Sequence, residues 1–101
     1  MTGEDVPVFW TPRALQDLKS IAAHIASDSP LGARGFAAKL KSSAEALTRF
    51  PRRGRMMPEL DRGDVREIIE GNYRIVYRIR YGAVDILTIF EGHRRFVHEE
   101  P

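Results

Sequence analysis

The sequence predicts a two-layer α+β fold in which a helix hairpin packs on one face of a mainly antiparallel sheet. Apolar residues recur at helical spacing through the first half of the chain and at every second position in its last third. Short turn signals separate these runs, so the predicted order of elements is β-α-α-β-β-β. An antiparallel meander cannot bury its apolar face alone, and the helix hairpin is expected to cover it.

The size of the chain restricts it to one domain with one modest core. It has 101 residues, of which 43% are hydrophobic and 30% charged, as in an ordinary folded protein. We expect a single domain over residues 1–101, with flexible ends at 1–5 and 97–101.

The residue types present exclude several kinds of site. There is no cysteine, which excludes disulfides and thiolate metal sites, and the three histidines are scattered at His24, His93 and His98. We therefore expect neither a metal nor another cofactor. No apolar run reaches the roughly 18 residues of a membrane span, and the acidic start is not expected to be a signal peptide, so we expect a cytoplasmic location.

The first strand and the first helix follow directly on one another. The stretch VPVFW at 6–10 is short and β-prone. Thr11 occupies a helix N-cap position and Pro12 the first helical position, so a helix is expected from there to about Ser27. Its apolar stripe consists of Leu15, Leu18, Ile21, Ala22 and Ile25.

A second helix is expected after the interruption SDSPLG at 27–32, which supplies cap candidates and a proline for a new start. Pro51 ends this helix. The short connection predicts an antiparallel hairpin. The apolar stripe of the second helix consists of Ala33, Phe36, Ala37, Leu40, Ala44 and Leu47.

Beyond Asp64, apolar residues recur at every second position instead of at helical spacing. A strand is predicted from about Asp64 to Ile69, closed by a turn at 71–72, and a second from Tyr73 to Tyr81 with an aromatic face and a mainly basic face. A turn at 82–83 leads to the last strand, which is apolar on both faces and therefore expected to be central. Val84, Ile86, Thr88 and Phe90 are assigned to one face, and Leu87 and Ile89 to the other.

Positive charge is concentrated in the second half of the chain. The net charge is only +2, but PRRGR at 51–55 and the arginines from 74 to 95 carry most of the basic groups. Arginine grips carboxylate or phosphate bidentately, so this half suggests an acidic protein or nucleic acid as partner; a solvated face without a partner is the alternative. Arg55 is either part of a basic loop or a target contact.

The last predicted strand ends in a cluster of charged residues. It consists of Glu91, His93, Arg94 and Arg95. Three interpretations remain open: a surface that contacts a partner, a nuclease site, or a solvated terminus. A related choice concerns the tyrosines at 73, 77 and 81, which we interpret as core and cross-strand packing rather than a platform for stacking bases.

A series of short stretches, taken in order, resembles the RelE/ParE superfamily of bacterial toxins. The stretches are WTPRALQDLKSI, LTRFPRRGR, PEL, VREI, YRIVYR, VDILTIF and GHRR. The resemblance covers nearly the whole chain. It implies a RelE/ParE-like fold and the toxin of a type II toxin–antitoxin pair, which inhibits growth until a cognate antitoxin neutralises it in a hetero-oligomer.

The resemblance implies one of two targets. RelE-like members cut mRNA in the ribosome, whereas ParE-like members are associated with poisoning DNA gyrase. RNA cleavage needs a base, an acid and cations near the phosphate. His93 could be base or acid, and Glu91 could orient it or act as base itself. The candidate cations are Arg55, Arg66, Arg74, Arg78, Arg94 and Arg95.

Position 96 favours the gyrase alternative. Several ribonuclease members carry a tyrosine near the C-terminus, whereas this chain has Phe96, which stacks on a base but cannot transfer a proton. His98 could substitute only from an ordered tail. We therefore predict a ParE-like gyrase inhibitor, with a metal-independent endoribonuclease that has Glu91, His93 and Arg94 at its site as the alternative. The expected target contacts are Arg55, Arg94, Arg95 and Phe96.

An antitoxin is expected to use the helix hairpin and the sheet. A groove beside the hairpin can accept a helix, and an exposed sheet edge can accept a strand. The apolar anchors of the antitoxin should meet the hairpin, and its acidic residues should meet arginines of the sheet. The predicted antitoxin contacts are Leu18, Ile21, Ile25, Leu40, Arg74 and Arg78.

Overall fold

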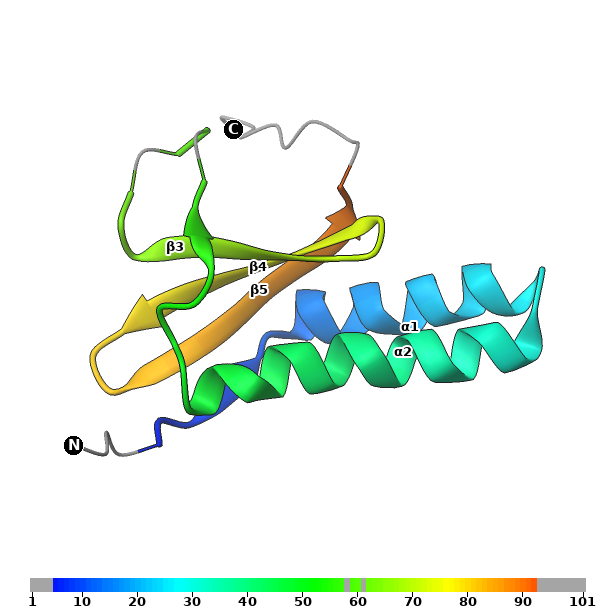
Figure 1. Ribbon diagram of the computed structural model, residues 1–101, viewed down its shortest axis with the longest axis horizontal. Coiled ribbons are helices and arrows are strands. Elements are labelled where there is room, and N and C mark those ends of the chain that lie inside the picture. Colours follow the sequence, from blue (N-terminus) through cyan, green and yellow to red (C-terminus); the bar gives the residue numbers. More distant parts are fainter. Residues whose placement is uncertain (1–4, 58, 61, 93–101) are drawn as a thin grey trace.

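Two antiparallel helices form one layer of the molecule, and a five-stranded sheet forms the other (Figure 1). This computed structural model describes residues 5–57, 59–60 and 62–92. Among these residues, no helix is both long and apolar enough to cross a membrane. The elements are β1 (Val8–Trp10), α1 (Pro12–Ala26), α2 (Pro30–Glu45), a 3-10 turn η1 (Ala46–Thr48), β2 (Arg55–Met56), β3 (Val65–Glu70), β4 (Tyr73–Arg80) and β5 (Ala83–Glu91).

Both helices begin at the predicted caps. The side chain of Thr11 accepts a hydrogen bond from the Ala14 N–H at 3.1 Å, and its hydroxyl lies 2.8 Å from the Ile86 carbonyl in β5. This residue therefore caps α1 and joins it to the sheet. At the start of α2, Ser29 accepts from the Gly32 N–H. The predicted helix hairpin is confirmed.

The strands lie in the order β1-β5-β4-β3-β2, with β1 parallel to β5 and the other neighbours antiparallel. This confirms the predicted two-layer α+β fold, and β5 lies inside the sheet with a strand on either side, although β4 is the middle strand. The prediction missed β2, which pairs Arg55 with Glu67 and Met56 with Arg66. Two residues are too few to show a period of two, so the sequence does not reveal this strand.

A bulge in β5 overturns part of the predicted face assignment. Residues on either side of Leu87 pair with consecutive residues of β4, so Leu87 is an extra residue in the ladder. Val84 and Ile86 face the helices, but after the bulge it is Ile89 that joins this core, whereas Phe90 packs on the opposite side of the sheet. The prediction that Phe90 shares a face with Val84 was wrong for this reason.

The tight turns sit close to their predicted places. Gly71 has a φ of 60° and Gly82 a φ of 71°, a backbone region that glycine adopts without strain. The second turn falls at Tyr81 and Gly82, because Ala83 already belongs to β5. Tyr81 is fully exposed at this turn, so the predicted core packing of the three tyrosines does not extend to it.

The sheet buries apolar residues on both of its faces. The larger core lies between helices and sheet and includes Leu40, Tyr73 and Tyr77, which confirms core packing for those two tyrosines. A smaller cluster of Met57, Val65, Val76 and their neighbours lies on the other face, which neither of the two described helices covers. We call this second side the helix-free face.

Candidate functional site

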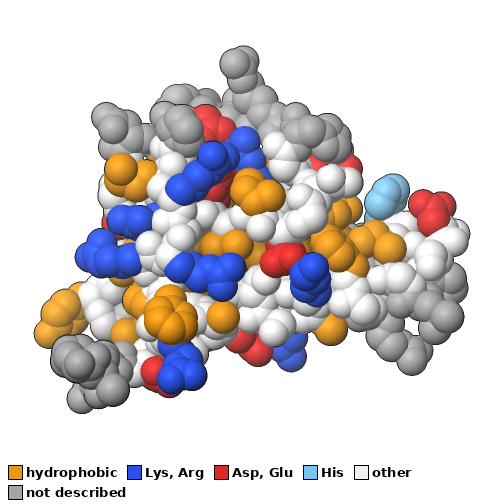
Figure 2. Space-filling view, viewed as in Figure 1, with side chains coloured by type: hydrophobic (Ala, Val, Ile, Leu, Met, Phe, Trp, Pro, Cys, Tyr) orange, Lys and Arg blue, Asp and Glu red, His pale blue; other side chains and the backbone are white. Residues whose placement is uncertain are grey.

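The helix-free face carries a row of arginines. Alternate residues of a strand share one face, so Arg74, Arg78 and Arg80 of β4 point the same way. Arg55 of β2 joins them because it pairs with Glu67, which pairs with Val76 of β4. We call Arg55, Arg74, Arg78 and Arg80 the arginine face. Lys and Arg side chains gather over the sheet half of the molecule in Figure 2.

Glu67 lies at the centre of the arginine face with its side chain fully buried. Its Oε2 atom is 2.5 Å from Nε of Arg55, and its Oε1 atom is 3.2 Å from Nη1 of Arg74. The same Nη1 lies 3.0 Å from Oε2 of Glu59. A buried carboxylate is stabilised only by such neighbours, so Glu67 fixes two of the four guanidinium groups.

Asp85 fixes the other two guanidinium groups, those of Arg78 and Arg80. Arg80 donates two hydrogen bonds to its carboxylate, at 2.6 and 3.0 Å, and Nη2 of Arg78 lies 3.5 Å away. The hydrogen bonds from Arg80 hold the pKa of Asp85 below its ordinary value. The pKa of Glu59 is also lowered, first by a backbone hydrogen bond and then by Arg74. Both carboxyl groups are therefore poor proton acceptors at neutral pH.

Next to this face, hydrogen bonds from the Tyr77 side chain anchor the chain from Pro51 to Gly54. The hydroxyl of the buried Tyr77 accepts a hydrogen bond from the Gly54 N–H and donates one to the Pro51 carbonyl, both at 2.8 Å. A Cβ atom on Gly54 would lie 2.5 Å from this hydroxyl and 2.7 Å from the Glu67 carbonyl oxygen, so only glycine fits. Burial raises the pKa of Tyr77, which suits a structural rather than a proton-transferring role.

Arg66 also anchors this loop, through hydrogen bonds from its guanidinium group. Its Nη1 atom lies 2.9 Å from the Gly54 carbonyl oxygen, and its Nε atom lies 3.2 Å from that of Gly63. The sequence suggested Arg66 as a phosphate-binding cation, but these backbone carbonyls already occupy its guanidinium group. The structure therefore gives Arg66 a role in holding the loop.

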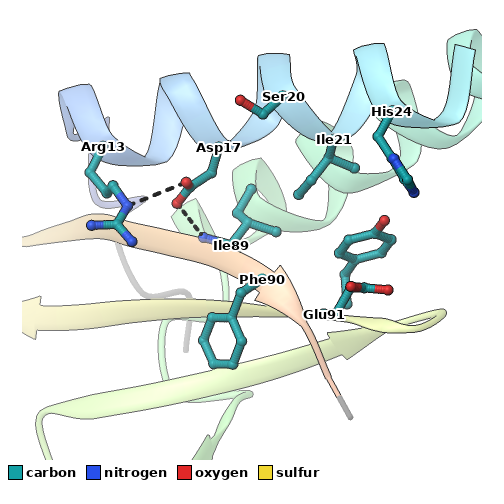
Figure 3. A pocket seen from close by; sticks show the side chains of 9 residues that line it. Arg13, Asp17, Ser20, Ile21, His24, Ile89, Phe90 and Glu91 are labelled. Carbon is teal, nitrogen blue, oxygen red and sulfur yellow. Dashed lines mark hydrogen bonds and ion pairs between the residues drawn. The ribbon is translucent and has the colours of Figure 1, made fainter. Parts of the chain in front are cut away.

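A cavity of about 330 Å³ lies on the other side of the sheet, between α1 and the end of β5 (Figure 3). Glu91 lines this cavity together with Arg13, Asp17 and His24, and it does not lie on the arginine face. Burial, and after it the negative charge of Glu91, raise the pKa of Tyr73 in the same cavity. Glu91 and the arginine face therefore belong to opposite sides of the sheet.

Asp17 links the start of α1 to the bulge of β5. Its carboxylate accepts hydrogen bonds from the Thr88 hydroxyl and from the Ile89 N–H, the second at 3.0 Å, and lies 3.3 Å from Nε of Arg13 (Figure 3). The bulge leaves backbone groups without ladder partners, and Asp17 satisfies one of them. Sequence analysis missed this role because Asp17 looks like any polar residue on a helix.

Comparison with known proteins identifies the family. Residues 8–96 match the model described as the ParE toxin of type II toxin–antitoxin systems, parDE. The chain belongs to this ParE toxin family. It is 40% identical over 88 residues to the Toxin RelE2 of Caulobacter vibrioides, covering 86% of this chain and 96% of the relative. It is 35% identical over 89 residues to the Putative toxin Y4kP of Sinorhizobium fredii, covering 86% and 88%.

Solved structures agree with the fold of this ParE-family toxin. The chromosomal ParDE toxin–antitoxin system of P. aeruginosa superposes with a TM-score of 0.74 at 21% identity, covering 88% of this chain and 98% of that one. The toxin–antitoxin complex RelBE2 of Mycobacterium tuberculosis gives a TM-score of 0.62 at 26% identity, covering 86% and 98%. The predicted RelE/ParE-like fold and superfamily are thereby confirmed.

Several predicted site residues of this ParE-family toxin lie outside the described residues. Those residues are His93, Arg94, Arg95, Phe96 and His98. Of the other candidate cations, the structure brings Arg55, Arg74 and Arg78 together on the helix-free face. Their carboxylate partners were missed, and the only signal for them in the sequence was an acidic residue in each neighbouring strand.

The predicted antitoxin contacts on the hairpin differ in exposure. Leu18 and Ile25 are half-buried, and Ile25 lines a second cavity of about 510 Å³ between the helices and the turn after β3. Ile21 is nearly buried but lines the first cavity. Leu40 is completely buried in the core and presents no surface of its own to a partner in this structure.

Acid should destabilise this toxin partly through Glu70. Hydrogen bonding from Ser43, and then the ammonium group of Lys39, hold the pKa of Glu70 below its ordinary value of 4.5. A lowered folded-state pKa contributes stability that is present above the unfolded pKa and is lost as pH falls through the folded one. Ser43→Ala should therefore reduce the free energy of unfolding at pH 7 and also reduce its loss below about pH 4.5.

Urea denaturation at a series of pH values between neutral and about pH 3 measures this effect. Ser42→Ala, at an exposed neighbouring position, is the matched control and should keep the stability and the pH profile of the unmodified protein. Identical pH profiles for Ser43→Ala and Ser42→Ala would show that Ser43 does not control Glu70.

Proposed function

We propose that this toxin is a ParE-like inhibitor of DNA gyrase, which acts by binding its target rather than by cutting RNA. The observation that carries the proposal is the arginine face, where each guanidinium group lies against a carboxylate. Such ion pairs can be exchanged for the charges of a partner, which suits recognition. Inhibition of gyrase is the activity associated with ParE-like members, and a cytoplasmic location suits it.

The placement of proton-transferring groups argues against a nuclease at this face. Glu91 lies across the sheet from the arginines. Of the described residues, His24 is the histidine, and it lies on α1. The pKa of Glu59 is lowered by a backbone hydrogen bond and then by Arg74, and that of Asp85 is lowered by Arg80. A general base and a general acid beside the bound phosphate are needed for RNA cleavage, and these groups do not supply them.

A cognate antitoxin is the proposed regulator of this toxin. The RelBE2 structure that resembles it is a toxin–antitoxin complex. We infer that the antitoxin places apolar side chains along α1, near Leu18 and Ile25, and acidic side chains near Arg74 and Arg78. The second cavity adds Phe36 to this apolar surface. Burial of both kinds of contact would favour a stable toxin–antitoxin hetero-oligomer.

The two possible targets are separated by two assays on one preparation. Purified gyrase is assayed for supercoiling with the toxin alone and with the toxin–antitoxin complex, and translating ribosomes are assayed for mRNA cleavage. We expect loss of supercoiling, relieved by antitoxin, with mRNA intact. Arg78→Ala should weaken inhibition several-fold, whereas Lys41→Ala, on the exposed side of α2, should not. Intact supercoiling together with cut mRNA would overturn the proposal.

The alternative is a RelE-like ribosome-dependent mRNA endonuclease. The 40% identical relative that carries the name Toxin RelE2 is the observation that favours it. In that case Glu91→Ala or His93→Ala should lower cleavage by about 100-fold while leaving binding nearly unchanged, as expected for a lost general acid or base.

A further inference from the structure

The loop at 49–53 differs from the arginine face in one respect: within the described part of the chain, its cations form no ion pairs with carboxylates. Arg49, Arg52 and Arg53 are exposed, and among the described residues none of them forms an ion pair. No acidic residue occurs in the sequence between Glu45 and Glu59. The loop therefore concentrates positive charge, and Arg53 acts on Glu70, whose pKa it helps to lower, through its charge and not through an ion pair between the two side chains.

The aromatic side chain of Phe50 lies in the same loop as these cations. Phe50 is 62% exposed, although burying a phenylalanine side chain is normally favourable. Together with Pro51, Arg52 and Arg53 it lines a hollow of about 400 Å³. An exposed ring between exposed guanidinium groups offers stacking and charge at the same place.

The backbone of the loop is held rigidly, so these side chains are presented in a fixed arrangement. The Arg53 N–H donates to the Phe50 carbonyl at 3.1 Å, which closes a turn with Pro51 at its second position, where the ring fixes φ. Tyr77 holds the Pro51 carbonyl, as described above, and Arg66 reaches the Arg52 carbonyl oxygen at 3.4 Å. Within the loop these contacts use backbone atoms, so they leave the side chains of Arg49, Phe50, Arg52 and Arg53 out of the hydrogen bonding.

We propose that the loop at 49–53 binds single-stranded nucleic acid, with Arg49, Arg52 and Arg53 on phosphates and Phe50 stacked on an unpaired base. Proteins that bind single strands combine a basic surface with aromatic platforms, and each stacked base contributes independently of its identity. An acidic peptide would use the arginines but would give no reason to expose Phe50. The proposal does not depend on gyrase being the target.

The experiment measures binding of fluorescent oligonucleotides of about 12 nucleotides to the full-length chain by anisotropy at several salt concentrations. Oligo-dT, oligo-U and a DNA duplex are the probes, which separates DNA from RNA and single strands from double strands. We expect both single strands to bind at least about tenfold more tightly than the duplex, because only an unpaired base can stack on Phe50.

Two sets of variants separate charge from stacking. Arg52→Glu with Arg53→Glu should weaken binding more than about tenfold and reduce the slope of log affinity against log salt by about 1.4, or about 0.7 for each phosphate contact. Phe50→Ala should weaken binding about tenfold and leave that slope unchanged, since stacking releases no counterions. The positions are exposed, so the variants should fold, which circular dichroism checks.

Matched controls make the outcome decisive. Lys19→Glu with Lys41→Glu changes the net charge equally at exposed helix positions, and Phe9→Ala removes a half-exposed phenylalanine elsewhere. Both should bind nearly as well as the unmodified protein. The proposal is overturned if these controls lose as much affinity as the loop variants, if Phe50→Ala has no effect, or if polyglutamate displaces the oligonucleotide at equal charge concentration, which would indicate an acidic protein partner.

Discussion

Gly54→Ala is expected to reduce the free energy of unfolding by about 3 kcal/mol. The added Cβ atom would lie 2.5 Å from the Tyr77 hydroxyl oxygen and 2.7 Å from the backbone carbonyl oxygen of Glu67. Neither neighbour can yield easily, because one is a buried side chain held by two hydrogen bonds and the other belongs to β3. The loop must move, and the buried Gly54 N–H then loses its acceptor.

Chemical denaturation followed by circular dichroism measures this loss. Gly35→Ala is the matched control, because no atom lies within 4 Å of a Cβ at that position in α2. Alanine there should stabilise the protein by up to about 1 kcal/mol through its better helix propensity. If the Gly54 and Gly35 variants were equally stable, the tight fit around Gly54 would have no energetic importance.

Glu67→Ala is expected to cost about 3 kcal/mol, at the lower end of the range for breaking a buried ion pair. The change leaves a void on the helix-free face and deprives Arg55 and Arg74 of their shared carboxylate. Arg55 has 61% of its side chain exposed and can turn to solvent, and Arg74 keeps Glu59, which limits the loss. The same variant should loosen both guanidinium groups and so weaken inhibition of the target.

Glu45→Ala, at an exposed position at the end of α2, removes the same charge and should change stability by less than about 0.5 kcal/mol. A double-mutant cycle with Arg55→Ala isolates the ion pair. Arg55→Ala should cost clearly more in the unmodified protein than in the Glu67→Ala background. Equal costs in the two backgrounds would mean that the two side chains do not interact.

The helices could be predicted from the sequence because their signals are local. Thr11 and Pro12 mark the start of α1, and the apolar stripes give the hairpin that must cover the sheet. The bulge at Leu87 could not be predicted, because an extra residue in a strand depends on how two strands pair. The short strand β2 has too few residues to carry a period and was missed for a related reason.

The candidate site was predictable only in part. The arginines of β4 were placed on one face correctly, since alternation along a strand decides it. Their partners depend on cross-strand register: Glu67 meets Arg55 only because β2 pairs with β3, and Asp85 lies opposite Arg78 only in the observed register of β4 and β5. Single-sequence patterns carry no information about such pairings.

The bulge of β5 also decides which charged groups lie on the same side of the sheet. If Leu87 took a regular place in the ladder instead of bulging out, the residues after it would shift by one position, bringing Glu91 around to the side of Arg74 and turning Phe90 toward the helices. The chain would then place a further carboxylate near the arginine face, in addition to those of Glu67 and Asp85, without any change of sequence. One extra residue in a strand thus keeps Glu91 on the helix side of the sheet in this small toxin, away from the arginine face.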